Sequence, residues 1–460
     1  MNLKEIFFLF IIIVGFLFSI FNNFYQIEHF DNFRINSNNV MVHSMITSDI
    51  FNFWKEGAMI AEDLTNGKSY LESGEEYRRP YLPSRIYAFF SILLSQDLVS
   101  KDGAVSLEFN KIPILIAQTS IYYILLICLY FVLNNHIPKN ISKLSIFFLA
   151  FEPTLFMYHS SFWSESFFFS LQILLLILIL FKNQNTFSFI LIGVVLGLLY
   201  LQRSVAVFYV FPVLIYLYFQ FRKKFLNSTF IILLILSIVH LFVGYHNYKR
   251  IGVFYSLSTQ AKDGFYDYFI PAIIAKKQKF SVNQAQNLIR EDSKVWMEEN
   301  NLDELSFKDE KKRLKYYDYA ENYAFDAMLQ NPIITLNLLI KNTIHFMIID
   351  PLTHVYFFHS WNDKNGSFYN SEIRKKMLLP RIFYSLFIYF FVIYGLYKFF
   401  KKERNNKIFL LIILSIMYFF LVQSWYGGTR YYAPILIYLS LPFAYGFVNF
   451  KDQIKKKLKN

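Results

Sequence analysis

Long apolar runs without any charged residue are the feature that most constrains the fold of this chain. Three of them lie at residues 7–21, 173–181 and 410–422. A helix that crosses a bilayer needs about 20 consecutive, mostly apolar residues and few or no charges. Of the 460 residues, 55% are hydrophobic and 20% are aromatic, which is more than the core of one water-soluble domain accommodates. The sequence therefore predicts an all-α polytopic membrane protein.

The positive charge of the chain is concentrated in short loops between these apolar runs. The formal net charge is +13, and basic residues cluster at 139–143, 222–224, 401–407 and 455–459. Short basic loops mark the cytoplasmic side of membrane proteins, so this charge indicates topology and not nucleic-acid binding. We expect both termini to be cytoplasmic, in the inner (plasma) membrane of a bacterium. No small-residue cleavage site follows the first apolar run, so we expect it to be retained as a helix.

About ten spanning helices are predicted from the length and hydropathy of the apolar runs. They lie at about 5–24, 112–134, 143–161, 163–182, 185–203, 204–221, 227–247, 381–400, 407–424 and 430–449. Two further apolar stretches, 80–94 and 332–349, contain polar or charged residues such as Arg85 and Lys341. Counting either stretch alone as a crossing would place basic loops outside. We therefore expect residues 80–94 to form an amphipathic segment along the outer interface.

The spans divide the chain into three parts. Residues 1–247 form an N-terminal transmembrane module with a first outer loop at about 25–111. Residues 248–380 form an extracytoplasmic helical region, in which apolar residues recur at helical spacing and predict two helices within 281–330. Residues 381–460 form C-terminal transmembrane helices and a basic cytoplasmic tail.

Three acidic residues are candidate site residues because of their positions. Asp49 opens an amphipathic stretch in the first outer loop, where it caps a helix or holds a carboxylate at the membrane surface. Glu165 begins an apolar helix at its outer end, where the helix dipole alone favours a carboxylate by roughly 0.3–1 kcal/mol. Glu152 lies inside a predicted span. Ionisable groups there are costly and indicate function, unless they pair with a polar neighbour such as His159.

Four arginines are candidate substrate-binding residues. Arg203 and Arg430 are predicted at the outer ends of spanning helices, against the usual charge bias. A guanidinium group binds phosphate through two parallel hydrogen bonds, and the alternative is that these side chains extend toward lipid headgroups. Arg79 and Arg85, in the first outer loop, are similar but less specific. The sequence contains no Gly-rich phosphate loop, HExxH motif or Cys/His cluster, which argues against soluble nucleotide chemistry and a cysteine-rich metal site.

The order of these features resembles that of the GT-C glycosyltransferases that use polyprenyl-phosphate sugars. Protein O-mannosyltransferases and the aminoarabinose transferases of lipid A are such enzymes. The first helix is followed by a loop with an early acid, Asp49, and then by a segment with two prolines at 79–83. The later matching elements, in order, are Pro153, the Ser–Glu pair at 164–165, Gly197–Leu198 with Arg203, the Asn–Tyr–x–x–x–Gly stretch at 247–252, and the Arg–Tyr–x–x–Pro stretch at 430–434.

This resemblance implies a GT-C-like bundle with extracytoplasmic juxtamembrane helices. It implies transfer of a sugar, by direct displacement, from a polyprenyl-phosphate carrier to a hydroxyl group of an envelope glycan, lipid or protein. Asp49 is the expected base, and Glu165 is expected to support it or to orient the acceptor. Arg203 and Arg430 are expected to stabilise the departing phosphate. No cofactor is certain. A divalent metal ion stays open, because the family often has an acid pair where this chain has Asp49 followed by Ile50.

Other functional classes stay open at this point. A transporter or lipid flippase needs polar groups along a path at the membrane midplane, where only Glu152 qualifies. An O-antigen polymerase or ligase shares the substrate chemistry but would not predict an acid as early as Asp49. A structural scaffold is a further alternative.

Overall fold

A computed structural model of the chain describes most of its residues. These are residues 3–30, 33–35, 41–43, 48–74, 80–100, 103–181, 185–256, 266, 269–302, 310–345, 347, 371–402, 407–424 and 429–458. Within this part of the chain almost all regular structure is helical. One small antiparallel sheet pairs β1 (Phe33–Ile35) with β2 (Met41–His43).

Each predicted span coincides with helix in the described part of the chain. The corresponding elements are α1 (Leu3–Phe30), α4 (Ile112–Leu133), α5 (Lys139–Phe151) with α6 (Pro153–Tyr158), α7 (Glu165–Leu180), α8 (Thr186–Gln202), η2 (Ser204–Tyr209) with α9 (Val210–Gln220), α10 (Phe225–Ile251), α17 (Ser371–Lys402), α18 (Lys407–Gln423) and α19 (Thr429–Lys457).

Five helical stretches among the described residues are long and apolar enough to cross a membrane. They are Leu3–Glu28, Ile112–Leu133, Arg222–Ile251, Leu379–Lys401 and Tyr432–Lys457. The helices of the other predicted spans are apolar but shorter. The chain is thus an integral membrane protein, and the number of ten crossings stays a prediction.

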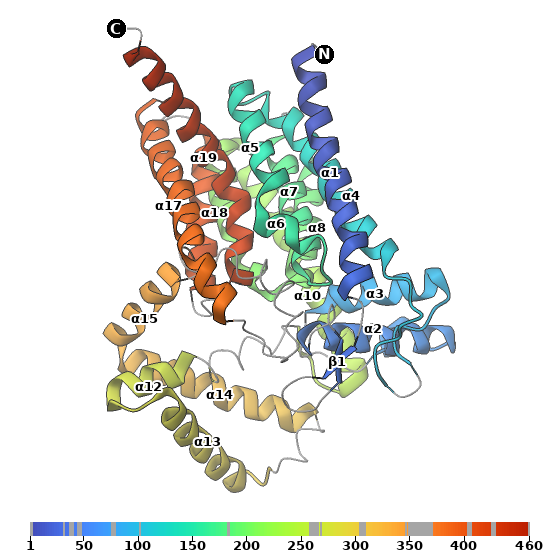
Figure 1. Ribbon diagram of the computed structural model, residues 1–460. Coiled ribbons are helices and arrows are strands. Elements are labelled where there is room, and N and C mark those ends of the chain that lie inside the picture. The colour runs from blue at the N-terminus through green and yellow to red at the C-terminus, as the bar shows by residue number, and fades with distance from the viewer. Residues whose placement is uncertain are drawn as a thin grey trace.

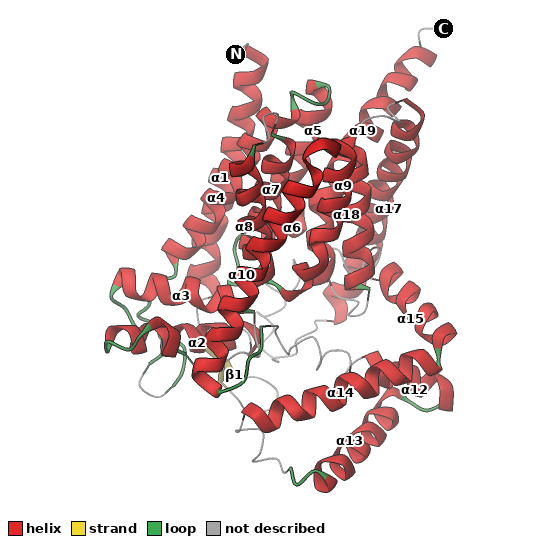
Figure 2. Cartoon of the chain, turned by 180° about the vertical axis from the view of Figure 1, so that it is seen from behind, coloured by secondary structure: helices red, strands yellow, loops and turns green. Residues whose placement is uncertain are grey.

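The remaining helices lie at one end of this bundle. They are α2 (Ser48–Thr65), η1 (Tyr70–Glu72), α3 (Tyr81–Leu94), α12 (Ile270–Gln278), α13 (Val282–Glu299), α14 (Glu310–Gln330) and α15 (Pro332–Ile344). Figures 1 and 2 show them at the end opposite both chain termini, which we call the loop end. Helices α13 and α14 confirm the prediction of two helices within 281–330. Ser281 is the N-cap residue of α13, and it forms a capping box with Gln284, in which each side chain accepts a hydrogen bond from the backbone N–H of the other residue.

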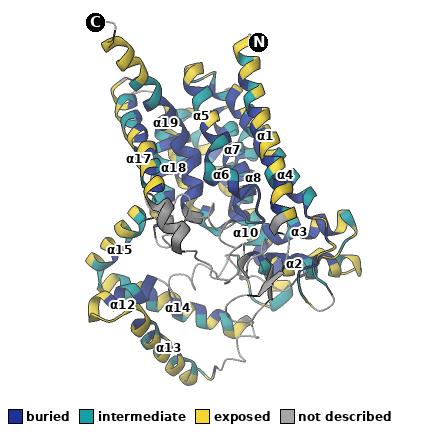
Figure 3. Ribbon diagram, viewed as in Figure 1, coloured by how far each residue is buried: buried dark blue, intermediate teal, exposed yellow. Residues whose placement is uncertain are grey.

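Burial follows the pattern of a bundle that is solvated by lipid. Figure 3 shows buried residues facing the centre of the bundle and exposed residues on its outer surface. Helix α19 is mostly buried, whereas α10 exposes large apolar side chains such as Leu226, Phe230 and Leu241. Water would disfavour so many exposed apolar groups, whereas lipid tails accommodate them.

Helices α17 and α19 pack backbone against backbone. A Cβ atom at Gly395 would lie 1.9 Å from the carbonyl oxygen of Pro442, and one at Gly446 would lie 1.9 Å from that of Phe391. Only glycine permits so close an approach. Small residues have this role in many membrane helix pairs, because lipid offers no hydrophobic force between helices.

The predicted span 143–161 is not one continuous helix, so this prediction was wrong. Helix α5 ends at Phe151, and α6 begins at Pro153. Proline lacks a backbone N–H and disfavours helical geometry in the residue before it. Glu152 accordingly adopts an extended backbone with φ −63° and ψ 122°. The break leaves its carboxylate at the start of a new helix inside the bundle.

Candidate functional site

A buried ion pair joins the first residue of α7 to the residue that follows α8. Arg203 Nη1 lies 2.7 Å from Glu165 Oε1, and the two side chains are 5% and 0% exposed. Charges this deeply buried are tolerated only when they are paired and hydrogen-bonded. The Arg203 side chain therefore points inward toward Glu165, and it does not extend toward lipid headgroups.

Neighbouring side chains hold this ion pair in place. The Ser164 hydroxyl donates to Glu165 Oε2 at 3.2 Å, and Gln202 Nε2 donates to the Ser164 carbonyl at 2.8 Å. The Arg203 guanidinium carbon lies 5.7 Å from the centre of the Phe168 ring. Ser164 and Phe168, at the start of α7, and Gln202, at the end of α8, thus fix the orientation of the ion pair.

The loop before Glu165 is held by a glutamine from a third helix. Gln118 of α4 donates through Nε2 to the carbonyl oxygens of His159, at 2.7 Å, and Ser161, at 2.9 Å. All three residues are buried. A single amide group thereby satisfies two backbone acceptors that have no helical partner. Gln118 was not among the predicted site residues, although a glutamine within an apolar span was a signal in the sequence.

We expect the substitution Gln118→Leu to destabilise the protein by about 2–4 kcal/mol, because it removes two buried hydrogen bonds and leaves their acceptors without this donor. Thermal unfolding in detergent would show it as a lower melting temperature. Gln453→Leu is the matched control. Gln453 is exposed at the far end of α19, where it accepts a hydrogen bond from Tyr394 at 2.6 Å. Equal shifts in the two variants would contradict this assignment.

Glu152 caps α6 and joins it to α17. Its Oε2 accepts from the backbone N–H of Leu155 at 2.9 Å, and its Oε1 accepts from the Tyr384 hydroxyl at 2.8 Å. The partner considered from the sequence, His159, instead lies with Nδ1 2.8 Å from the Ser166 hydroxyl. The Glu152 carboxylate is therefore satisfied by a helix cap and a tyrosine.

The start of α2 packs against the loop that carries Glu165. Asp49 lies in the first turn of α2, and Ile50 beside it is fully buried in a cluster with Tyr87 and Phe162. The Tyr87 hydroxyl donates a hydrogen bond to the Phe162 carbonyl, three residues before Glu165. The side chain of Asp49 lies outside the described residues, so its role stays a prediction.

Trp54 anchors α2 and α3 as one unit. Its indole N–H donates to the Leu98 carbonyl at 2.7 Å, and its ring contacts those of Tyr87, Phe109 and Phe162. The side chain is fully buried. A buried tryptophan with a satisfied N–H stabilises a packed layer strongly, so the two helices present a fixed surface to the bundle.

Arg85 of α3 lies in a second polar cluster, between α3 and α10. Its Nη1 is 3.9 Å from Glu56 Oε1 and donates to the Tyr81 carbonyl at 3.2 Å, and its side chain is 10% exposed. The guanidinium carbon lies 3.8 Å above the Tyr81 ring. Its Nε and Nη2 atoms have no hydrogen-bond partner among the described residues. A buried guanidinium with two such N–H groups is suited to bind an anion.

Aromatic residues surround this arginine. The Tyr81 hydroxyl donates to the Tyr70 hydroxyl at 3.0 Å, and His246 of α10 lies with Nε2 3.1 Å from the Tyr70 carbonyl. Burial raises the pKa of Tyr81 well above its ordinary value, so the phenol beneath Arg85 stays neutral. Arg85 is consequently a cationic group that this cluster can offer to an anion.

Two predicted arginines lie wholly or partly outside the described residues. Arg79 falls within 75–79, and only the backbone of Arg430 is described, in the first turn of α19. Their roles stay predictions. Among the described side chains, no group of three or more His, Cys, Asp or Glu residues is arranged to hold a metal ion. The side chain of Asp49 is not among these described side chains.

One segment of the chain is similar to a known protein family. Residues 104–246 match the family model described as dolichyl-phosphate-mannose-protein mannosyltransferase. This segment includes Glu152, Glu165 and Arg203, and it runs from the loop before α4 almost to the end of α10. No curated protein sequence matches the chain.

The fold is similar to that of an archaeal oligosaccharyltransferase. The chain matches AglB from Archaeoglobus fulgidus in complex with an inhibitory peptide and a dolichol-phosphate, with a TM-score of 0.53 and 12% identity, over 100% of this chain and 52% of that chain. It also matches the Archaeoglobus fulgidus oligosaccharyltransferase tethered to an acceptor peptide, with a TM-score of 0.51 and 12% identity, over 99% and 51%. The chain spans about half the length of these structures. It has the GT-C fold.

Proposed function

We propose that this chain is a membrane glycosyltransferase that takes its sugar from a polyprenyl-phosphate carrier. The acceptor is a hydroxyl group of an envelope glycan, lipid or protein, and the loop end faces away from the cytoplasm. One observation carries the proposal. The buried pair of Glu165 and Arg203 lies within the segment that matches a mannosyltransferase family model, in a chain with the GT-C fold.

In the proposed reaction, the acceptor oxygen forms a bond to the anomeric carbon while the bond from that carbon to the phosphate oxygen breaks. The acceptor proton passes to the carboxylate of Asp49. The ordinary pKa of an aspartate, about 3.9, makes it a weak base in water, so positioning at the start of α2 has to assist it. Inversion at the anomeric carbon is the expected stereochemical course.

Positive groups near the departing phosphate stabilise the charge that develops there. Preorganised charge of this kind often makes the largest single contribution to catalysis. Arg203 is oriented by Glu165, which is itself fully buried. The Nε and Nη2 atoms of Arg85 at the loop end have no hydrogen-bond partner among the described residues, and we propose that they bind the phosphate of the donor. Arg430 and Arg79 have the same proposed task.

A transporter is less well supported. That alternative depended on Glu152 as an ionisable group available along a path through the membrane. Its carboxylate instead accepts hydrogen bonds from Leu155 and Tyr384. A carboxylate that caps a helix and joins two others has a sufficient structural reason to be there.

The test of the proposal is sugar transfer by the purified full chain. The protein would be incubated with radiolabelled polyprenyl-phosphate sugars and a membrane extract as the source of acceptors. Label that moves to an acceptor supports the proposal. If no donor is used, but vesicles containing the protein take up a lipid or a solute, the transporter is correct instead.

We expect Arg85→Gln to raise the KM for the donor by about tenfold or more, because a hydrogen bond to a charged group contributes about 1.5–3 kcal/mol. Donor titrations in the same assay would measure it. Arg290→Gln is the matched control, since Arg290 is an exposed arginine of α13 at the same end of the bundle. The double variant Glu56→Gln/Arg85→Gln tests whether the rise in KM comes instead from the Glu56 carboxylate after it has lost Arg85. A donor KM unchanged in both Arg85 variants would contradict the assignment.

A further inference from the structure

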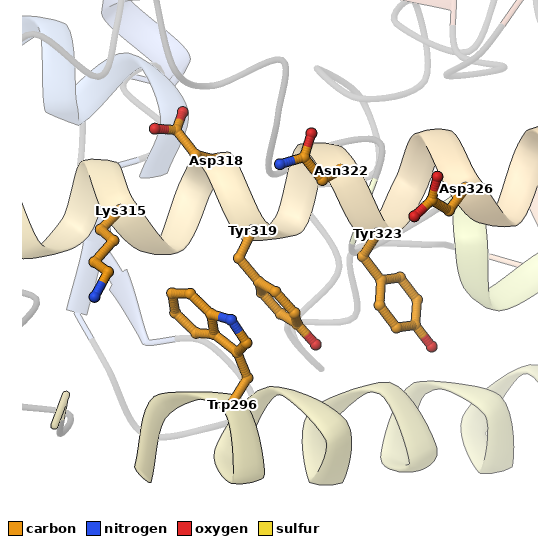
Figure 4. Close-up of a pocket in the computed structure, with 7 residues that line it drawn as sticks. All are labelled: Trp296, Lys315, Asp318, Tyr319, Asn322, Tyr323 and Asp326. Carbon is orange, nitrogen blue, oxygen red and sulfur yellow. The ribbon is translucent and has the colours of Figure 1, made fainter. Parts of the chain in front are cut away.

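Helices α13 and α14 enclose an open groove at the loop end. Its volume is about 410 Å³. The lining residues come from both helices and combine aromatic rings with polar side chains: Trp296, Lys315, Asp318, Tyr319, Asn322, Tyr323 and Asp326. Figure 4 shows Trp296 extending from α13 toward α14, with Tyr319 and Tyr323 extending toward it from the other side.

Stacked aromatic rings form the floor of this groove. The rings of Trp296 and Tyr319 are nearly parallel, with centroids 4.4 Å apart and planes 17° apart. Tyr323 follows one turn later, with its ring centroid 6.0 Å from that of Tyr319. All three side chains are only partly buried. Trp296 and Tyr319 cover one face of each other, so this aromatic surface offers a ligand the outer faces of the stack and the ring of Tyr323.

Tyr323 is held rigidly by a hydrogen bond. Its hydroxyl donates to Asp292 Oδ2 at 3.0 Å. Burial, and then the nearby Asp292 carboxylate, raise the pKa of Tyr323 well above its ordinary value, so the phenol keeps its proton and the bond persists. The ring therefore does not need to reorganise when a ligand stacks against this surface.

These rings flank the hydrophobic core of the region. That core packs α12, α13, α14 and α15 together, and its members include Tyr266, Phe269, Ile270, Ile273 and Ala285. Each of these five is at most 3% exposed. Tyr319 and Tyr323 pack against this core on one side and, like Trp296, remain partly exposed. Large rings normally bury most of their surface, so their partial exposure here leaves a face available to a ligand.

The groove is rimmed by polar groups of mixed charge. Lys315, Asp318, Asn322 and Asp326 are all exposed along α14. In Figure 4, Asp318 and Asn322 point away from α13, so they border the groove from the side of α14 that does not carry the rings of Tyr319 and Tyr323. Their carboxylate and amide groups can accept hydrogen bonds from hydroxyl groups, and Lys315 and Asn322 can donate them. Two carboxylates close to one site disfavour a phosphate group.

We propose that this groove binds a carbohydrate unit of the acceptor, with a sugar ring placed on an outer face of the stack formed by Trp296 and Tyr319. The positively polarised C–H face of a sugar ring complements the negative face of an aromatic ring, and its hydroxyl groups match the polar rim. The volume lies within the range of about 300–1,000 Å³ that is typical of small-ligand sites. This inference rests on the proposed function and specifies its acceptor class.

The position of the groove fits an acceptor site. Figures 1 and 2 show α13 and α14 at the same end of the bundle as α2 and α3, which carry Asp49 and Arg85. A glycan chain held on α14 would be on the side of the membrane on which transfer is proposed. The groove would thus retain the acceptor near the site and act as a positioning surface.

The test is oligosaccharide binding by the full chain in detergent, measured by saturation-transfer NMR with cellotetraose, chitotetraose and mannotetraose. We expect at least one of them to bind, and Trp296→Ala and Tyr319→Ala to weaken that binding by about tenfold or more. Val295→Ala is the control, since Val295 is an exposed neighbour on α13. Failure of all three to bind overturns the inference, as does equal binding by the Trp296 and Val295 variants.

A cationic peptide is the competing ligand, because aromatic faces and carboxylates also attract ammonium groups. Binding of tetralysine, without binding of any oligosaccharide, would overturn the carbohydrate assignment. Failure of this inference can be separated from failure of the proposed function. Sugar transfer without oligosaccharide binding would disprove only the assignment of the groove as a carbohydrate site. Oligosaccharide binding that depends on Trp296, without transfer from any donor, would support that assignment and disprove the glycosyltransferase function.

Discussion

Replacing Asp49 with asparagine is expected to reduce sugar transfer by about 10²–10⁴-fold, the range typical of a lost general base. Asparagine has nearly the same shape as aspartate but cannot take up the acceptor proton. Its neighbour Ile50 is fully buried and anchors the start of α2, so the helix is expected to remain in place. The loss should appear in kcat, with little change in the donor KM.

Transfer from a radiolabelled polyprenyl-phosphate sugar measures this effect, and the melting temperature verifies that the variant folds. Glu62→Gln is the matched control, because Glu62 is an exposed carboxylate on the same helix. It should transfer sugar at the rate of the wild type. If Asp49→Asn and Asp49→Ala both fold and keep full activity, Asp49 is not the base.

Breaking the buried ion pair is expected to have the largest effect on stability. Either Glu165→Gln or Arg203→Met should lower the free energy of unfolding by about 3–5 kcal/mol, because each leaves the opposite charge buried without this partner. The two side chains are at most 5% exposed, and their charged atoms are 2.7 Å apart. Chemical or thermal unfolding in detergent measures the loss.

The double variant Glu165→Leu/Arg203→Met separates stability from catalysis. It removes both charges, so most of the stability should return, while sugar transfer should stay low. Recovery of transfer would show that the pair is only structural. Lys139→Ala is a control that breaks an ion pair whose lysine is exposed to solvent. Lys139 Nζ lies 2.6 Å from Glu5 Oε1, but the Lys139 side chain is 64% exposed, and little change is expected from so exposed a pair.

Local sequence pattern was sufficient for most of the helices. The positions of the predicted spans match helices because a bilayer requires a long apolar run, and such a run is visible within a window of about 20 residues. The helices within 281–330 were predicted from spacing alone. The break at Glu152 was also a local property, because Pro153 stands beside it. It was missed because mean hydropathy measures the apolar character of a segment and not the backbone geometry that a proline imposes.

Glu165 and Arg203 were both recognised as candidates from their positions at helix ends, but their pairing was not. The two residues are 38 positions apart. The sequence indicated a phosphate ligand or a lipid contact for Arg203, whereas the structure directs it into the bundle. For Arg85, the sequence showed a charge within an apolar stretch, and only the structure revealed which of its nitrogen atoms lack a hydrogen-bond partner in the described part of the chain.

The sequence was sufficient to infer a helical membrane protein, the positions of its apolar helices and the polar residues at their ends, because apolar length and charge are properties of short segments. Which of those residues meet is visible only in the fold. Gln118 reaches a carbonyl 41 positions away, and Tyr384 reaches a carboxylate 232 positions away. Such contacts depend on how helices distant in sequence are rotated and stacked, which is set by packing over the whole bundle and is not encoded in any one segment.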